Sequence, residues 1–407
     1  MHGTFPFLIW LMASAFWVCT PQFSKAQESD LPAELDTSQD WSNNWSGTWQ
    51  ERRQRRQDRF DRFLNWELSD NTLLSFYGQL NFLYLDYDDD IDPFTSFRDN
   101  ANSPGRLGLR LETNFDNGTG LLVNLETGLR RSTYDGIIRS GGVQDDFEDW
   151  DKTLLRKAEL RLSIPSFGFL SIGQGSMAGD GITGFDFSRT GVIATNSVGD
   201  TISGEPAYFA NGEQSASQLQ AFFPTFDGSR RFRVRYDSVT KRGLSWAASA
   251  GREVLIDDDN NTYADVALRY ETEWRNFRIK TGVAATYNDT SPDFFSGSVA
   301  GIDEKTGLNF TIAGGANSRQ GRYLYGKVGL IRSFFDFGDT SVSLDYYHSD
   351  EPLAGTNNSR SWGASIVQSI KTSQTEIYAT YRQYDVDAIG REIQDARVIA
   401  AGVRFLW

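Results

Sequence analysis

The sequence predicts an all-β protein, a transmembrane antiparallel β-barrel of about sixteen strands with a long third loop folded into the lumen. Three observations indicate this fold. Segments from residue 73 to residue 407 alternate apolar and polar side chains, their connections alternate in length, and the chain stops on an apolar strand. A soluble sheet that ended on such a strand would have an aggregation-prone edge, whereas a barrel removes the edge by pairing its last strand with its first.

The final segment, residues 397–407, shows the alternation most clearly. Five side chains that share one face are Ile399, Ala401, Val403, Phe405 and Trp407. A period of two with one apolar face is typical of a strand that contacts lipid on one side. An ordinary edge strand of a soluble sheet is the alternative interpretation of this segment alone.

Fifteen segments of this kind occur between residues 73 and 407, and a weaker one at 294–301 raises the count to about sixteen. An even number places both chain ends on the same side of the membrane. We therefore expect an outer-membrane protein whose N-terminus and C-terminus are both periplasmic. No segment after residue 26 is apolar enough to form a membrane-spanning helix.

The connections alternate between two kinds. Short turns occur at residues 116–119, 165–168, 239–243, 275–276 and 336–339. Long acidic or glycine-rich loops occur at residues 88–103, 131–151, 175–228, 253–262 and 349–359. Short turns on one rim and long loops on the other are the arrangement of outer-membrane barrels. Because a loop as long as 175–228 needs a packing surface, the lumen of the barrel is its expected location.

The N-terminal region predicts export. Residues 5–18 form an apolar run too short to span a bilayer, and Ser24-Lys25-Ala26 reads as a cleavage site, so residues 1–26 are predicted to be a signal peptide. Residues 27–72 are predicted to be a periplasmic extension, with an arginine-rich stretch at 51–64. This stretch is either a short helix that touches the barrel mouth, a wall polymer or a partner, or a solvated, partly disordered leader.

Composition excludes several classes of function. The 407 residues carry a formal net charge of −14, which argues against nucleic acid as a partner. The single cysteine, Cys19, lies within the predicted signal peptide, and one histidine, His348, remains after it. We therefore expect no enzyme activity, no cofactor and no metal site. Aromatic residues make up 14%, as expected for a barrel with aromatic girdles.

Charge placement predicts the pore. Arg or Lys facing lipid near the midplane costs about 2–4 kcal/mol, so the basic residues of the strands are expected to face the lumen. The predicted basic cluster of the pore wall is Arg106, Arg110, Arg231, Arg233, Arg235 and Arg269. The predicted acids of the constriction loop are Asp180, Asp186, Asp200, Glu205 and Glu213. Folded inward, the acids would face the arginines and create a transverse field. Pairing of the arginines with loop acids for stability alone is the alternative.

Several segments resemble landmarks of the general diffusion porins of Gram-negative bacteria. They are Tyr77-Gly78-Gln79-Leu80-Asn81, Arg106-Leu107-Gly108-Leu109-Arg110, Phe167-Gly168, Arg233-Val234-Arg235-Tyr236-Asp237-Ser238 and the C-terminal strand. The resemblance covers residues 73–407. It implies a sixteen-stranded barrel, a homotrimer and a third loop that folds into the pore, with outer-membrane lipid and lipopolysaccharide around it.

The function that these features predict is a water-filled channel for passive diffusion of small hydrophilic solutes and ions, with a weak preference for anions. The alternative is a substrate-specific channel for anionic oligosaccharides or other acidic nutrients, which the excess of inward arginines favours. A closed adhesin or structural barrel is a third class. Ohmic conductance and saturable block by a ligand would distinguish the three.

Overall fold

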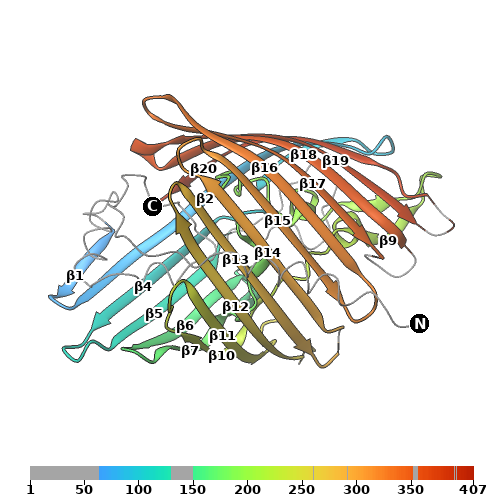
Figure 1. Ribbon diagram of the computed structural model, residues 1–407. Helices are drawn as coiled ribbons and strands as arrows, with labels where there is room; N and C mark the ends of the chain where they lie inside the picture. The colour runs from blue at the N-terminus through green and yellow to red at the C-terminus, as the bar shows by residue number, and fades with distance from the viewer. Residues whose placement is uncertain are drawn as a thin grey trace. The chain divides into compact units, whose positions relative to one another are not determined.

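The computed structural model describes residues 64–129, 150–259, 261–290, 292–351, 356–388, 390 and 392–407. In these residues, sixteen antiparallel strands close into a barrel (Figure 1). The first eight in pairing order are β2 (Thr72–Asp88), β4 (Arg106–Asn114), β5 (Gly120–Gly128), β6 (Leu155–Ile164), β7 (Gly168–Ser176), β10 (Arg230–Ser238), β11 (Leu244–Arg252) and β12 (Thr262–Trp274). The remaining eight are β13 (Phe277–Asn288), β14 (Phe294–Asp303), β15 (Leu308–Asn317), β16 (Arg322–Phe335), β17 (Gly338–Asp350), β18 (Thr356–Ile370), β19 (Thr375–Ala388) and β20 (Ala396–Leu406).

The barrel closes between its first and last strands. β20 pairs with the second half of β2, and the backbone of Trp407 exchanges two hydrogen bonds of 3.1 Å with Gly78. Two shorter strands extend the sheet, with β1 (Asn65–Ser69) and β3 (Phe94–Asp99) both pairing with β2. The predicted all-β barrel is confirmed, and the weak segment at 294–301 is the strand β14.

Alternation along each strand separates a lipid face from a lumen face. In β16, Leu324 and Val328 are exposed on the outside, whereas Tyr325 and Lys327 are buried inside the barrel. In β20, Ile399 is exposed and its neighbours are buried. Because side chains on a strand point alternately to opposite sides, a two-residue period is sufficient to specify which residues contact lipid.

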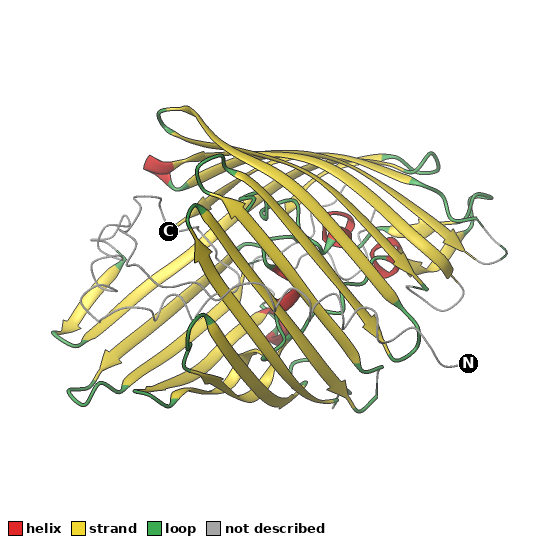
Figure 2. Ribbon diagram, viewed as in Figure 1, coloured by secondary structure: helices red, strands yellow, loops and turns green. Residues whose placement is uncertain are grey.

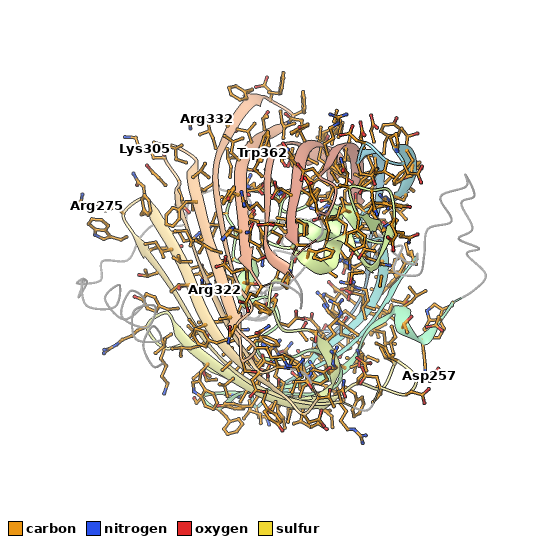
Figure 3. The ribbon with its side chains drawn as sticks, turned by 90° about the vertical axis from the view of Figure 1, so that its right-hand side faces the viewer. Asp257, Arg275, Lys305, Arg322, Arg332 and Trp362 are labelled. Atoms are coloured by element: carbon orange, nitrogen blue, oxygen red, sulfur yellow. The ribbon has the colours of Figure 1, made fainter. Side chains whose placement is uncertain are left out.

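The two rims differ. Two- to five-residue turns connect the strands on the rim near Trp407, and exposed Phe334, Phe335 and Trp274 lie there at positions suited to a membrane interface. Arg275, Lys305 and Arg332 lie at the outer edge of the barrel in Figure 3. The opposite rim carries the longer loops.

The third of these loops, residues 177–229, lies inside the barrel. It contains a small hairpin, β8 (Pro206–Tyr208) and β9 (Gln214–Gln218), and three short 3-10 helices at Ile182–Gly184, Val198–Ile202 and Leu219–Phe222. Figure 2 shows helical turns between the walls of the barrel. The predicted location of the third loop is therefore confirmed.

Parts of the N-terminal prediction lie outside the described residues. The predicted signal peptide and residues 27–63 of the predicted extension, with most of the arginine-rich stretch, are among them. The strand β1 falls within the segment 27–72 that the sequence placed before the barrel. The predicted boundaries of the three regions therefore remain predictions.

Candidate functional site

The third loop packs against only part of the lumen wall. Its hydrogen bonds to wall side chains reach β3, β10 to β12 and β14 to β19, together with a segment of the chain at residues 100–102. Farther along the circumference, charged side chains of β4, β5 and β6 contact one another and the rings of Tyr77 and Phe169. We call the wall that the loop contacts the covered wall. The strands β4 to β7, with β10 at their border, form the uncovered wall, which faces the remaining space of the lumen.

Apolar side chains hold the loop on the covered wall. Val192, Ile202 and Phe223 are each no more than 3% exposed and join Tyr347 and Val398 of the wall in one apolar cluster. Burying one such side chain contributes about 1.5–3 kcal/mol. Nearer the start of the loop, Ile182, Phe185 and Phe187 pack against alanines of the wall. The small alanine side chains leave room for these larger ones. The alanines are Ala247, Ala267, Ala284 and Ala300.

Charged contacts anchor the loop at separate points of the wall. Asp186 accepts a 2.6 Å hydrogen bond from Lys327 on β16, whose ammonium also donates to the carbonyl of Ala194 at 2.9 Å. Glu205, which is fully buried, pairs with Arg98 on β3 at 2.9 Å. Arg189, the loop cation, pairs with Asp339 on β17 at 2.7 Å. Low exposure makes each pair sensitive to loss of one partner.

Another buried ion pair lies within the wall itself, beneath the loop. Arg382 on β19 and Asp345 on β17 are 2.7 Å apart, and both side chains are almost fully buried. Arg382 also donates to the Ser361 hydroxyl on β18. The pair thus joins three adjacent strands on the lumen side.

The root of the loop is held by wall arginines. Arg235 donates to the Met177 carbonyl at 2.7 Å, Arg233 donates to the Ser176 carbonyl at 3.1 Å, and Arg269 donates to the Ala178 carbonyl at 2.5 Å. These carbonyls lie in β7 and where the chain leaves it. Three residues of the predicted basic cluster therefore position the loop.

The uncovered wall has more basic than acidic side chains. On the described lumen side of β4 to β7 and β10, eight cationic side chains accompany four carboxylates. The cations are Arg106, Arg110, Arg156, Lys157, Arg161, Arg231, Arg233 and Arg235, and the carboxylates are Glu112, Glu126, Glu159 and Asp237. The difference is four positive charges at neutral pH.

The carboxylates on this wall are engaged by neighbouring cations. Glu126 lies 2.7 Å from Arg156 and 3.7 Å from Lys157, and accepts a hydrogen bond from the Tyr77 hydroxyl at 2.9 Å. Glu159 pairs with Arg233. Such pairing leaves the remaining positive charge directed to the lumen.

Other basic residues of this wall contact aromatic rings, a glutamine side chain or the carboxylate of Glu253. Arg110 lies 4.7 Å from the Tyr77 ring, and Arg161 lies 4.4 Å from the Phe169 ring. Arg231 pairs with Glu253 at 3.2 Å. Arg106 donates to Gln79 at 3.2 Å. These contacts keep the guanidinium groups along the wall while their charge is retained.

The five predicted loop acids do not gather at one place. Asp186 and Glu205 pair with the covered wall, as described above. Asp180, at the loop root, lies within electrostatic range of Arg235. Burial raises the pKa of Asp200 to about 7. Glu213 is exposed in the β8–β9 hairpin, whose neighbours bond to residues 392 and 394. Whether these residues set selectivity remains a prediction.

A segment between β3 and β4 contributes to the lumen and was not anticipated from the sequence. Buried Asn100 donates to the Val192 carbonyl at 2.8 Å, and Asn102 donates to the Thr201 hydroxyl at 3.1 Å. The loop is therefore hydrogen-bonded both to the barrel strands and to residues 100–102. Asn100 gives no signal in the sequence, because short polar segments between strands usually read as turns.

Arg156 was also missed, for a different reason. Strict alternation places Arg156 on the lipid face, since Lys157 faces the lumen. The pairing of β5 with β6 shifts register between Glu126 and Thr127, so Arg156 reaches Glu126 inside the barrel. A bulge of this kind re-aims one side chain and has no simple sequence signature.

Comparison with known families identifies the chain. A sequence model described as Gram-negative porin matches residues 71–389. The chain therefore belongs to the Gram-negative porins, and the predicted resemblance is confirmed. Search of curated proteins gives no match.

Solved structures show the same fold at low sequence identity. An anion-selective porin from Comamonas acidovorans has a TM-score of 0.54 and 14% identity, covering 83% of this chain and all of that one. The DcaP channel of Acinetobacter baumannii has a TM-score of 0.53 and 9% identity, covering 85% and 100%. Salmonella typhi OmpF, in complex with daunomycin, has a TM-score of 0.52 and 10% identity, covering 84% and 100%.

Family and fold together define an outer-membrane channel for passive diffusion. The predicted channel function is confirmed at this level. They are the family and fold of a channel rather than of an enzyme.

Proposed function

We propose that this channel passes small hydrophilic solutes and ions with a weak preference for anions. The observation that carries the proposal is the excess of four positive charges on the uncovered wall of the lumen. Charges in a narrow, low-dielectric pore act strongly on passing ions, whereas exposed loop charges are screened within about 8–10 Å at ordinary salt. The acidic net charge of the whole chain therefore does not set the preference.

Reversal potentials under a salt gradient test this selectivity. Arg110→Gln and Arg161→Gln remove lumen charges from residues that lie against the Tyr77 and Phe169 rings, away from the loop root. Both variants should shift the reversal potential toward cations at nearly unchanged conductance. Arg397→Gln, at an exposed rim position, is the matched control and should shift it less.

Two results would contradict the proposal. A wild-type channel that strongly prefers cations would contradict the proposed preference for anions. A reversal potential that neither Arg110→Gln nor Arg161→Gln moves would show that the uncovered wall does not line the ion path. The triple change of Arg231, Arg233 and Arg235 to Ser is a weaker test, because two of these arginines also hold the loop root.

The second candidate function is a substrate-specific channel for anionic oligosaccharides or other acidic nutrients. The same basic wall favours it, since arginine side chains along a path can contact successive acidic groups. Saturable block of the ionic current by an acidic oligosaccharide would support this function. Current that falls only in proportion to solution viscosity would support unselective diffusion.

Arrangement in the membrane forms a further part of the proposal. Both termini are periplasmic, the long loops face outward among lipopolysaccharide, and the chain assembles as a homotrimer, as its family suggests. A protease added to intact cells should cut the long-loop rim and leave the turn rim uncut. Cross-linking in detergent that yields only monomer would remove the trimer.

A further inference from the structure

A cavity of about 220 Å³ lies beside the root of the third loop, on the side of the long loops. Both ends of the loop and four wall strands form it. The lining residues are Met177, Asp227, Gly228 and Ser229 from the loop, and Arg231, Tyr263, Asp265, Thr286, Asn288 and Phe294 from the strands. None of the loop acids or wall arginines used above, except Arg231, belongs to this lining.

Backbone contacts make the cavity wall firm. The Met177 amide donates to the Ser229 carbonyl at 3.0 Å, which joins the two ends of the loop. The Gly179 amide donates to Asp265 of β12 at 2.7 Å, which ties the loop start to the wall. The backbone at Gly228 lies against Asp180 so closely that a Cβ at Gly228 would be 2.3 Å from the Asp180 nitrogen. A site built on such contacts is largely preformed.

One side of the lining is cationic. The Arg231 guanidinium lies 4.2 Å from the Tyr263 ring and pairs with Glu253 at 3.2 Å. Its Nε atom has no hydrogen-bond partner among the described residues. Thr286 is 6% exposed, and its hydroxyl likewise lacks a partner in the described part of the chain. Polar atoms left without partners in a buried site are costly, so a bound polar group would be favoured.

Another part of the lining is anionic. Asp227 accepts amide hydrogen bonds from Gly181 at 3.0 Å and Thr183 at 3.4 Å. No ion-pair partner of Asp227 occurs among the residues that the structure describes. Burial and the charge of Asp180 raise the pKa of Asp227 to about 7. This carboxyl group is therefore partly protonated at neutral pH, and a ligand cation beside it would favour its charged form.

Size and charge together define the ligand class. At about 220 Å³, the cavity has room for a small solute with several polar groups. A guanidinium and an unpaired carboxylate in one small cavity match a molecule that carries both an anion and a cation. A neutral polyol or a simple carboxylate would leave Asp227 without a counter-charge. A zwitterion supplies a cation for Asp227 and a carboxylate for the Arg231 Nε, the part of this guanidinium that Glu253 leaves without a hydrogen bond.

We propose that this cavity is a subsite for a small zwitterionic amino acid, with the ligand carboxylate at Arg231 and Thr286 and its ammonium group at Asp227. The proposal rests on the channel function and adds a solute class to it. The subsite lies next to the loop root, where a solute that moves through the lumen can reach it. Binding there raises the local concentration of such solutes at the channel mouth.

Current block by L-serine, with glycerol and lactate as size-matched comparisons, tests the subsite. L-serine should reduce the single-channel current in a saturable way, whereas glycerol and lactate should not at the same concentration. Arg231→Gln and Thr286→Val should each raise the half-blocking concentration, by at least about tenfold for the charge change. Thr286→Ser should retain block, and Arg252→Gln, which changes a rim charge outside the lining, should leave it unaltered.

Equal effects of L-serine and glycerol, or block by L-serine that Arg231→Gln and Thr286→Val leave unaltered, would overturn the subsite. Stronger block by lactate than by L-serine would assign the cavity to anions and also overturn it. A protein that gives no conductance steps would instead contradict the channel. Isothermal calorimetry of detergent-folded protein with L-serine would then test the subsite separately, where absence of saturable heat, or equal heat from Arg231→Gln, contradicts it.

Discussion

Replacing Arg98 by Met should loosen the third loop without unfolding the barrel. Arg98 is the described ion-pair partner of Glu205, the two side chains are 2.9 Å apart, and Glu205 is fully buried. Removing one partner of a buried pair costs about 3–5 kcal/mol, because the remaining charge stays in a low-dielectric site. At about 1.4 kcal/mol per factor of ten, the lower value alone raises the open population of this loop segment about a hundredfold.

The rest of the loop should remain in place. Phe222, Phe223 and Ile202 are buried in the apolar cluster, and each contributes about 1.5–3 kcal/mol. We therefore expect local opening around residues 203–209 and not release of the whole loop. Opening there should also expose the β8–β9 hairpin to protease, since the hairpin tip is already at the surface.

Open-channel current noise in planar bilayers and limited proteolysis measure this opening. Arg98→Met should increase both, and the double variant Arg98→Met with Glu205→Gln should restore most of the wild-type behaviour by removing the unpaired charge. Arg322→Met is the matched control, because Arg322 pairs with Asp350 at 2.7 Å but is largely exposed. Such surface pairs contribute about 0–1 kcal/mol.

Wild-type noise and cleavage in Arg98→Met would refute this reasoning. An equally large effect of Arg322→Met would also refute it, because burial would then not determine the cost. Failure of the double variant to recover would show that the guanidinium acts by packing and not by its charge.

Three further predictions concern the wall and the loop. Arg382→Met should lower the free energy of unfolding by about 3–5 kcal/mol, because its partner Asp345 is almost fully buried. Urea titration in detergent measures this loss. Replacing both partners by Leu should cost less, and equal losses would contradict the prediction. Gly78→Ala should reduce the yield of folded barrel on heat-modifiability gels, because its Cβ would lie 2.6 Å from the Arg106 carbonyl oxygen and 2.6 Å from the Trp407 ring. Gly326→Ala is the control and should fold normally, since the space around Gly326 is open. Similar yields of the two variants would exclude a steric effect at barrel closure. Burial raises the pKa of Asp200 from 3.8 to about 7, so the folded loop favours the protonated acid. Its contribution to stability is present below about pH 4 and is lost as the pH rises through 7. Noise should therefore be greater at pH 8.5 than at pH 6. Asp200→Asn should reduce the difference and leave the part that Asp227 causes, and an unchanged difference would contradict the assignment to Asp200.

Faces and strands could be predicted from the sequence because they depend on local geometry. A two-residue period needs no knowledge of the neighbouring strand, so the alternation of Val398 and Ile399 predicted which side chain meets lipid. The strand at 294–301 was weak in the pattern because small residues such as Gly297 and Ser298 occupy much of it. Its lumen side lies under the loop, where small side chains leave room for Ile182 and Phe185.

The amino-acid sequence by itself determined the all-β class, the alternation of lipid and lumen faces and the presence of a long third loop, because each depends on residues that are neighbours in the chain. Only the tertiary structure decided the partners of the charges. Asp186 meets Lys327 across 141 positions, and Glu205 meets Arg98 across 107. The one-residue shift at Arg156 brings another charge inside. Coulomb attraction depends on distance in space, and closure of the barrel brings these groups together.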